Sequence, residues 1–163
     1  MILTDIFKKK RKEFPKMVVL YLSSELNKIL VAPQYVDESW IRFEQEEIEI
    51  LNFDCSNELL GETIKRNFDK FARKNMEDKK RTSKDWPAYQ ASKLRSMKEF
   101  ENKYDRITIN GANEANIIMT FEADMNLKSD INLTSSVSAF ADNEKLGSLT
   151  KELNEIQKSK KFE

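Results

Sequence analysis

Hydrophobic and polar positions follow a regular order in the first half of the chain. Residues 17–22 (MVVLYL) are β-branched, aromatic and aliphatic, which is typical of a strand, and residues 28–32 (KILVA) can pair back on them as a hairpin. A third strand is predicted to begin at residues 40–43, and residues 48–53 predict a fourth. The first half therefore predicts four strands, and a helix follows them.

That helix is predicted to begin after Ser56, whose hydroxyl can accept a hydrogen bond from an unpaired backbone amide one turn later. Steps of four, four and three residues then place one apolar stripe on one side of the helix: Leu60, Ile64, Phe68 and Phe71. We expect this stripe to cover one face of a sheet.

The same design returns near the C-terminus. Asp142 is a predicted N-cap, and NEKLG at residues 143–147 repeats NELLG at residues 57–61, at an offset of 143 − 57 = 86 residues. A second apolar stripe follows: Leu146, Leu149, Leu153 and Ile156. The repeat predicts a strand-and-helix unit used twice, roughly over residues 17–74 and 104–158, within a single domain of residues 1–163.

Between the two units, residues 73–84 have almost no apolar content and predict a mobile connection. Asp85 can cap a further helix with Pro87 in its first turn, and the apolar spacing continues this helix to Tyr104. Strands are then predicted at residues 106–109, 116–121, 131–133 and 137–140, with Asn110-Gly111 beginning the loop of a hairpin, and a helix is predicted from residue 143 to about residue 158.

This order of elements predicts an α+β fold with a central twisted antiparallel sheet and helices packed mainly on one face. Only three glycines and three prolines occur in 163 residues, so the chain has no glycine-rich phosphate loop and no linker that would divide it into two domains.

The numbers of histidine and cysteine residues limit the kinds of catalytic and metal site that the chain can form. The chain has no histidine, which removes histidine-dependent catalytic triads and histidine metal ligands. The single cysteine, Cys55, excludes an internal disulfide, and its place after an apolar strand favours an inert, buried thiol. These counts make an enzyme less expected but leave carboxylate and lysine chemistry open. We expect no cofactor and no metal.

Charge is unevenly distributed although the formal net charge is zero. Residues 37–62 hold nine acidic side chains and one arginine (1 − 9 = −8), whereas residues 65–103 hold thirteen basic and six acidic ones (13 − 6 = +7). The acidic segment could attract a basic partner.

The motifs named above resemble those of the CdiI family of immunity proteins, which belong to bacterial contact-dependent growth inhibition systems. The resemblance lies in NELLG, its echo EKLG at residues 144–147, and SMKEFENKY at residues 96–104 followed directly by a strand. The order of elements matches from about residue 21 to residue 156.

The resemblance implies a non-enzymatic cytoplasmic inhibitor that binds the C-terminal toxin domain of a CdiA effector, several of which are nucleases. It also implies a mode of binding in which a toxin hairpin adds a strand to the antiparallel sheet. A nuclease must bind polyphosphate and tends to present a basic cleft. We therefore predict that the toxin binds an acidic surface made of six residues: Asp37, Glu38, Glu44, Glu46, Glu47 and Glu49. The alternative is that these side chains form only a solvated strand face and loop.

Three further interpretations stay open. A nucleic-acid-binding module would use the basic residues 65–84 with Phe71, Trp86 and Tyr89. An enzyme would use paired carboxylates such as Glu44 and Glu46, but no spacing distinguishes any pair among 28 acidic residues. The tryptophans, at positions 40 and 86, could anchor an interface, although packing in or near the core is favoured for both.

Location follows from the same patterns. No apolar run reaches the roughly 20 residues of a bilayer span, and at the N-terminus the apolar residues precede the basic run 8–12, the reverse of a signal peptide. We expect a cytoplasmic protein that binds no membrane.

Overall fold

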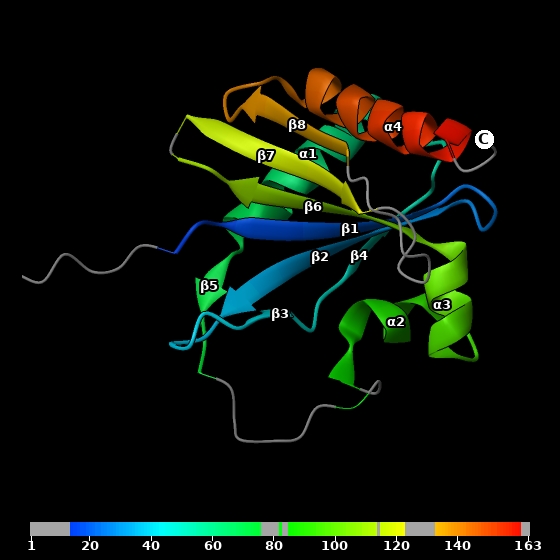
Figure 1. Cartoon of the computed structure of the whole chain (residues 1–163), viewed down its shortest axis with the longest axis horizontal. Coiled ribbons are helices and arrows are strands. Elements are labelled where there is room, and N and C mark those ends of the chain that lie inside the picture. The colour runs from blue at the N-terminus through cyan, green and yellow to red at the C-terminus, as the bar shows by residue number, and fades with distance from the viewer. Residues whose placement is uncertain (1–13, 76–81, 83–84, 114, 123–132, 161–163) are drawn as a thin grey trace, which may run out of the picture.

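The computed structural model describes residues 14–75, 82, 85–113, 115–122 and 133–160 (Figure 1). Its strands are β1 (Met17–Ser23), β2 (Lys28–Val36), β3 (Arg42–Glu44), β4 (Glu49–Leu51), β5 (Ala72–Arg73), β6 (Asp105–Gly111), β7 (Asn116–Glu122) and β8 (Leu133–Ser138). They form one sheet in the order β3-β2-β1-β6-β7-β8, and β4 and β5 also pair with β2. Every pair is antiparallel except β2 with β5.

The centre of the sheet is covered on both faces. In β1, every residue from Val18 to Ser23 is buried, because successive side chains of a strand point to opposite faces and each face meets a helix layer. Val18, Leu20 and Leu22 belong to one buried cluster, and Val19 and Tyr21 belong to the other.

The four helices divide between these two faces. The long helices α1 (Asn57–Asp69) and α4 (Asn143–Lys160) lie side by side on one face, as Figure 1 shows. The short helices α2 (Pro87–Ser92) and α3 (Met97–Lys103) pack on the opposite face. The predicted fold class, α+β with a central antiparallel sheet, is confirmed, and the longer helices share one face of the sheet while the shorter ones pack on the other.

The long helices begin where the sequence predicts. The Ser56 hydroxyl accepts a hydrogen bond from the Leu59 amide at 3.2 Å, and the Asp142 carboxylate accepts one from the Lys145 amide at 2.8 Å. Both apolar stripes pack against the sheet, but each ends one residue earlier than predicted. Phe71 lies beyond the end of α1 at Asp69, and Ile156 of α4 is 47% exposed.

The prediction of one helix from Asp85 to Tyr104 is wrong, because the structure has two short helices, α2 and α3, in this range. Lys93 adopts a left-handed conformation (φ 59°) that ends α2, and the Ser96 hydroxyl starts α3 by accepting from the Glu99 amide at 3.1 Å. The Asp85 carboxylate does not cap α2, since it accepts from the Thr82 amide at 2.7 Å.

The hairpin between β6 and β7 turns later than predicted. Strand pairing continues through Asn110 and Gly111, and the turn is closed by the Ala112 amide, which donates to the Asn116 carbonyl at 2.9 Å. The Asn113 side chain accepts from the Ala115 amide at 2.8 Å, so an asparagine two positions beyond the predicted dipeptide shapes this turn.

The last predicted strands belong to one element. Residues 133–138 form β8, whereas residues 131–132 of the first predicted strand lie outside the described residues, as does most of the connection predicted at residues 73–84. Among the helices that the structure describes, none combines the length and the apolar composition of a bilayer span.

Candidate functional site

The predicted acidic residues lie in the segment 37–49, between the end of β2 and the start of β4. Their six carboxylates occupy four different environments, and most of them contact groups of this chain. They do not form one acidic face, because Glu49 contacts α1 whereas Glu44 contacts residues on the opposite face of the sheet.

Asp37 shapes the loop between β2 and β3. Its carboxylate accepts hydrogen bonds from the Ser39 amide at 2.8 Å and the Ile41 amide at 2.9 Å, and its own amide donates to the Ile41 carbonyl at 3.0 Å. The loop holds Trp40 in a left-handed conformation (φ 67°) with 41% of its surface exposed. This loop turns the indole out of the core and onto Phe14, with ring centroids 4.4 Å apart, so Trp40 is only partly buried.

Glu44 points into an aromatic cluster beneath α2. Its carboxylate accepts from the Tyr21 hydroxyl at 2.6 Å, the Trp86 indole N–H at 2.8 Å and the Ala88 amide at 2.7 Å. These bonds tie β1, β3 and the start of α2 together. Trp86 also packs edge-on against Phe100, with centroids 5.4 Å apart, as expected for a half-buried tryptophan.

Burial controls the ionisation of this cluster. Desolvation raises the pKa of the Glu44 carboxyl above its ordinary value, although the three donors act in the opposite direction. Desolvation and the adjacent Glu44 carboxylate raise the pKa of Tyr21 well above its ordinary value. This geometry suits a fixed structural contact, since the three groups that donate hydrogen bonds to Glu44 are neutral groups of this chain.

Glu49 forms the strongest ion-pair group of the segment. Its carboxylate lies 2.6 Å from the Arg66 guanidinium and 2.9 Å from the Lys70 ammonium, both on α1. The hydrogen bond from Arg66 is the main cause that lowers the pKa of Glu49 to about 2. The pair fixes β4 against α1.

The exposed carboxylates pair with the segment that follows α1. Glu38 lies 3.1 Å from Arg73, and Glu46 lies 2.9 Å from Lys74, which lowers the pKa of Glu46. Glu47 is exposed, like Glu38 and Glu46. The acidic and basic segments of the sequence therefore lie against one another, and much of their opposite charge is neutralised locally.

The residues proposed for nucleic-acid binding are also engaged. Arg66, Lys70, Arg73 and Lys74 contact the carboxylates just named. Tyr89, like Trp86, packs against Phe100 on the opposite face of the sheet from α1. In the part of the chain that the structure describes, Trp86 and Tyr89 therefore do not share a surface with these bases, whereas Phe71 lines a groove together with Lys65.

Chemical groups suited to catalysis are sparse in the described residues. No group of three or more histidine, cysteine, aspartate or glutamate side chains lies close enough to hold a metal ion in these ranges. Burial raises the pKa of the partly buried Cys55 thiol, which disfavours the reactive thiolate.

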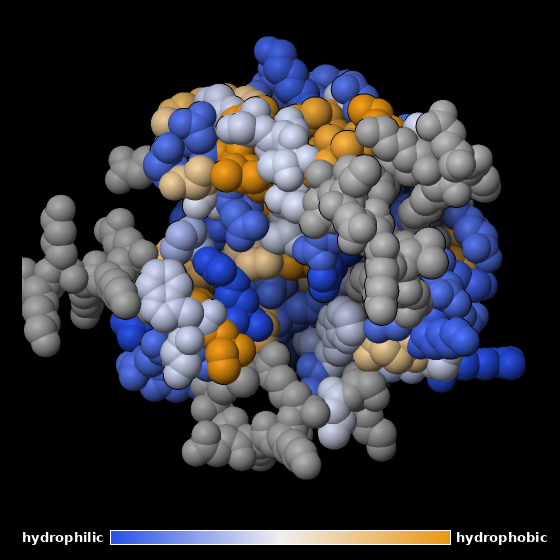
Figure 2. Space-filling view, in the orientation of Figure 1, coloured by the Kyte–Doolittle hydropathy of each residue, from blue (hydrophilic) through white to orange (hydrophobic). Residues whose placement is uncertain are grey.

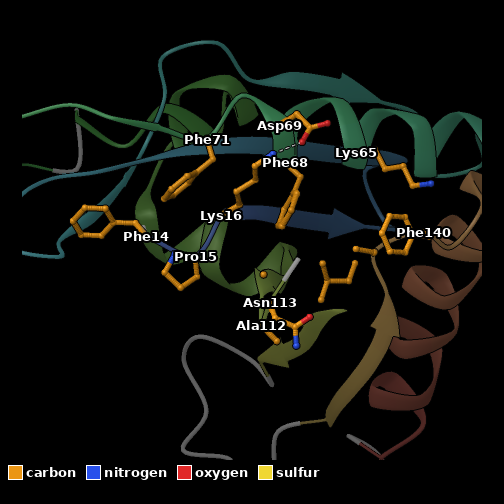
Figure 3. Close-up of a pocket in the computed structure, with 13 residues that line it drawn as sticks. Phe14, Pro15, Lys16, Lys65, Phe68, Asp69, Phe71, Ala112, Asn113 and Phe140 are labelled. Carbon is orange, nitrogen blue, oxygen red and sulfur yellow. Dashed lines mark hydrogen bonds and ion pairs between the residues drawn. The ribbon is translucent and has the colours of Figure 1, made fainter. Parts of the chain in front are cut away.

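A second site is an open groove of about 860 Å³ at the C-terminal end of α1 (Figure 3). The spacing of residues in the sequence does not predict it, because its walls come from segments far apart in the chain. The lining includes four phenylalanines, two lysines and one aspartate, and we call it the aromatic groove: Phe14, Pro15, Lys16, Lys65, Phe68, Asp69, Phe71, Gly111, Ala112, Asn113, Ile117, Ala139 and Phe140. One residue of the groove could be predicted to be exposed. Phe140 continues the alternation of inward and outward positions in β8 and falls on an outward position.

The face drawn in Figure 2 is mainly hydrophilic, and its apolar residues form separate small patches. The two candidate surfaces of this chain are thus the carboxylates of residues 37–49 and the aromatic groove. Neither has the geometry of a preformed catalytic centre.

Comparison of the sequence finds no match to a protein-family model and none to a curated protein. The fold is similar to that of a protein of unknown function from Neisseria meningitidis, with a TM-score of 0.61, 12% identity, and 83% of this chain and 91% of that chain covered. It is also similar to a chain of the CdiA-CT/CdiI toxin and immunity complex from Yersinia pseudotuberculosis, with a TM-score of 0.54, 12% identity, and 83% and 93% covered. At this identity the likeness concerns the fold.

Proposed function

We propose that this chain is an immunity protein that binds and neutralises a toxin domain without performing a reaction itself. The observation that carries the proposal is the likeness of the whole fold to a chain of a toxin–immunity complex. The motifs that resemble the CdiI family point to the same role, with the C-terminal domain of a CdiA effector as the partner and the cytoplasm as the place of binding.

The architecture suits an inhibitor that acts by its shape. Helices cover both faces of the sheet, and buried hydrogen bonds such as those of Glu44 hold α2 in place. A rigid surface loses little conformational entropy when it binds a partner. A small domain of this kind can occlude an active site without any catalytic group.

One edge of the sheet suits the strand addition that the resemblance implies. In the described part of the chain, β8 pairs with β7 and no strand pairs with its other edge. Its side chains alternate between half-buried and exposed, as in a strand with one solvent face. Backbone amides and carbonyls at such an edge can bind an extended segment of a partner.

The partner we propose is a nuclease toxin with a basic cleft. Of the predicted acidic residues, Glu38, Glu46 and Glu47 are exposed and available for contact, while Asp37, Glu44 and Glu49 would support that surface from within. Cations of the toxin would replace Arg73 and Lys74 in the ion pairs of Glu38 and Glu46. Such exchange favours fast and selective association more than high affinity.

The test is complex formation with the polypeptide encoded immediately upstream of this chain. We expect a one-to-one complex in size-exclusion chromatography and loss of the nuclease activity of that polypeptide on addition of this protein. No complex, or a complex in which the upstream polypeptide keeps its activity, would contradict the proposal. A labelled oligonucleotide provides the comparison, because tight binding to it at moderate salt would favour the alternative that uses residues 65–84.

The acidic surface has a test of its own. Replacement of Glu38, Glu46 and Glu47 by lysine is expected to slow association with the toxin about tenfold or more at low salt, and the difference should shrink as salt rises. The matched control reverses three other glutamates, Glu101, Glu152 and Glu155, which lie on α3 and α4 outside this segment. An unchanged, salt-insensitive association rate would remove the acidic residues from the interface.

A further inference from the structure

The aromatic groove joins four parts of the chain at one end of the fold. The C-terminal half of α1 forms one wall, the residues before β1 and the β6–β7 turn form the floor and a second wall, and the residues after β8 close the end (Figure 3). Gly111 keeps the floor open, because a β-carbon there would lie 3.4 Å from the tip of the Phe68 ring.

Its apolar surface is unusually exposed. Phe140 is 81% exposed, the highest fraction among the exposed large hydrophobic side chains of the described residues. In Figure 3, Phe140 and Lys65 lie at one end of the groove, Phe14 and Phe71 at the other, and Phe68 between them. Exposed aromatic side chains that surround a hollow are typical of a protein-binding surface.

The charges of the lining are unequal. Lys16 lies 2.5 Å from Asp69, so these two charges offset each other. Lys65 donates to the backbone carbonyl of Ala141, which carries no net charge. The Asp142 carboxylate, which does not line the groove, attracts Lys65 electrostatically but forms its ion pair with Lys145 at 3.1 Å. Lys65, near the exposed Phe140, is therefore the lining cation that has no ion pair with a carboxylate of the lining among the described residues.

The groove is continuous with the acidic surface proposed to bind the toxin. Phe14 lines the groove and also contacts Trp40, and the Arg73 guanidinium lies 5.2 Å from the centre of the Phe14 ring. Arg73 in turn pairs with Glu38. A single partner can therefore contact the exposed carboxylates and the groove together.

We propose that the groove binds a segment of the toxin that carries an aromatic or large aliphatic side chain next to a carboxylate. The apolar side chain packs between Phe140 and Phe68, and the carboxylate binds the ammonium group of Lys65. This inference rests on the proposed function, because the segment belongs to the same toxin.

The experiment compares two groove variants with two matched controls. Phe140→Ser removes the exposed ring, and Leu59→Ser removes an exposed apolar side chain of α1 that does not line the groove. Lys65→Gln removes the charge but keeps a donor for Ala141, and Lys98→Gln removes an exposed charge from α3. Thermal unfolding followed by circular dichroism confirms that each variant folds.

The first probe is a phage-displayed library of random twelve-residue peptides, selected on the wild-type protein. We expect enrichment of peptides that place an aromatic or large aliphatic residue beside aspartate or glutamate. Their affinity, measured with the synthetic peptides, should fall at least tenfold for Phe140→Ser and Lys65→Gln and stay within twofold for both controls. No enrichment, or equal binding to all variants, would overturn the proposal.

The second probe is the polypeptide encoded upstream. We expect its affinity to fall at least tenfold for the groove variants alone. A complex that is insensitive to both groove variants would refute the docking site and leave the proposed function intact, whereas the absence of any complex would refute the function itself. Self-association of the wild-type protein that Phe140→Ser abolishes would identify a second copy as the occupant and overturn the proposal.

Discussion

A β-carbon on Gly61 would lie 1.9 Å from the backbone carbonyl oxygen of Asn143. The contact is reciprocal, because a β-carbon on Gly147 would lie 2.0 Å from the carbonyl oxygen of Asn57. The same two asparagines donate side-chain hydrogen bonds across the pair, Asn57 to Glu144 and Asn143 to Glu58, each at 3.0 Å. The repeated sequence NELLG and NEKLG is thus a packing motif in which α1 and α4 meet at their N-terminal turns.

Replacement of Gly61 or Gly147 by alanine should destabilise the protein strongly. Each added methyl group would overlap a backbone carbonyl of the other helix, which cannot move aside as a flexible side chain can. We expect a loss of about 3 kcal/mol or more in the free energy of unfolding, measured by urea denaturation. Gly111→Ala is the control, since its β-carbon would make ordinary contacts, 3.4 Å from the tip of Phe68 and 3.5 Å from the backbone nitrogen of Lys16, and it should change stability by less than about 1 kcal/mol.

Glu44→Gln should destabilise the contact between α2 and the sheet. Both carboxylate oxygens accept hydrogen bonds, so an amide would direct its N–H group at a donor, either Ala88 or the pair of Tyr21 and Trp86. We expect a loss of about 1–3 kcal/mol in the free energy of unfolding. Glu47→Gln, at an exposed position, should change it by less than about 0.5 kcal/mol. Equal stabilities of the two variants would show that the Glu44 contacts contribute little.

Local signals in the sequence predicted the elements better than the site. Ser56 and Asp142 cap their helices through amides three residues away, so a short window contains the whole interaction. Glu44 contacts Trp86 and Ala88 across 42 and 44 residues, and Glu49 contacts Arg66 across 17. Sequence spacing therefore could not show which carboxylates are used inside the fold, nor that the acidic and basic segments pair with each other.

The break between α2 and α3 was missed for a related reason. Apolar residues continue at helical spacing through residues 94–104. Lys93 nevertheless adopts a left-handed conformation, which a lysine in the sequence does not predict. The signal that remained was Ser96, followed three residues later by Glu99, which is the start of a new helix. The groove was missed because its lining comes from four separate segments of the chain.

Lys93→Gly should stabilise the protein. Glycine adopts a φ of 59° without the steric cost that a β-carbon brings, and Lys93 is exposed, so few contacts are lost. We expect a gain of about 0.5–1 kcal/mol in the free energy of unfolding, or a rise of a few degrees in the melting temperature. Lys98→Gly, inside α3, should instead lower stability by about 1 kcal/mol. A loss of stability in Lys93→Gly would contradict this account of the α2 terminus.

The Glu49 ion pairs should make stability depend on acid. The pKa of Glu49 is lowered from an ordinary 4.5 to about 2, chiefly by the Arg66 hydrogen bond, so the folded state holds its proton more weakly than the unfolded state. Its contribution is complete above about pH 4.5 and is lost as the pH falls toward 2. Glu49→Gln should lower stability by roughly 1 kcal/mol at pH 7, because it removes two partly exposed pairs. The measurement is the free energy of urea unfolding between pH 2 and pH 7. The values for wild type and Glu49→Gln should converge at the acid end. Glu62→Gln is the control and should follow wild type throughout, because Glu62 pairs more distantly with Arg66, at 3.3 Å. A constant gap between wild type and Glu49→Gln across this range would mean that the carboxylate charge is not what stabilises the contact between β4 and α1.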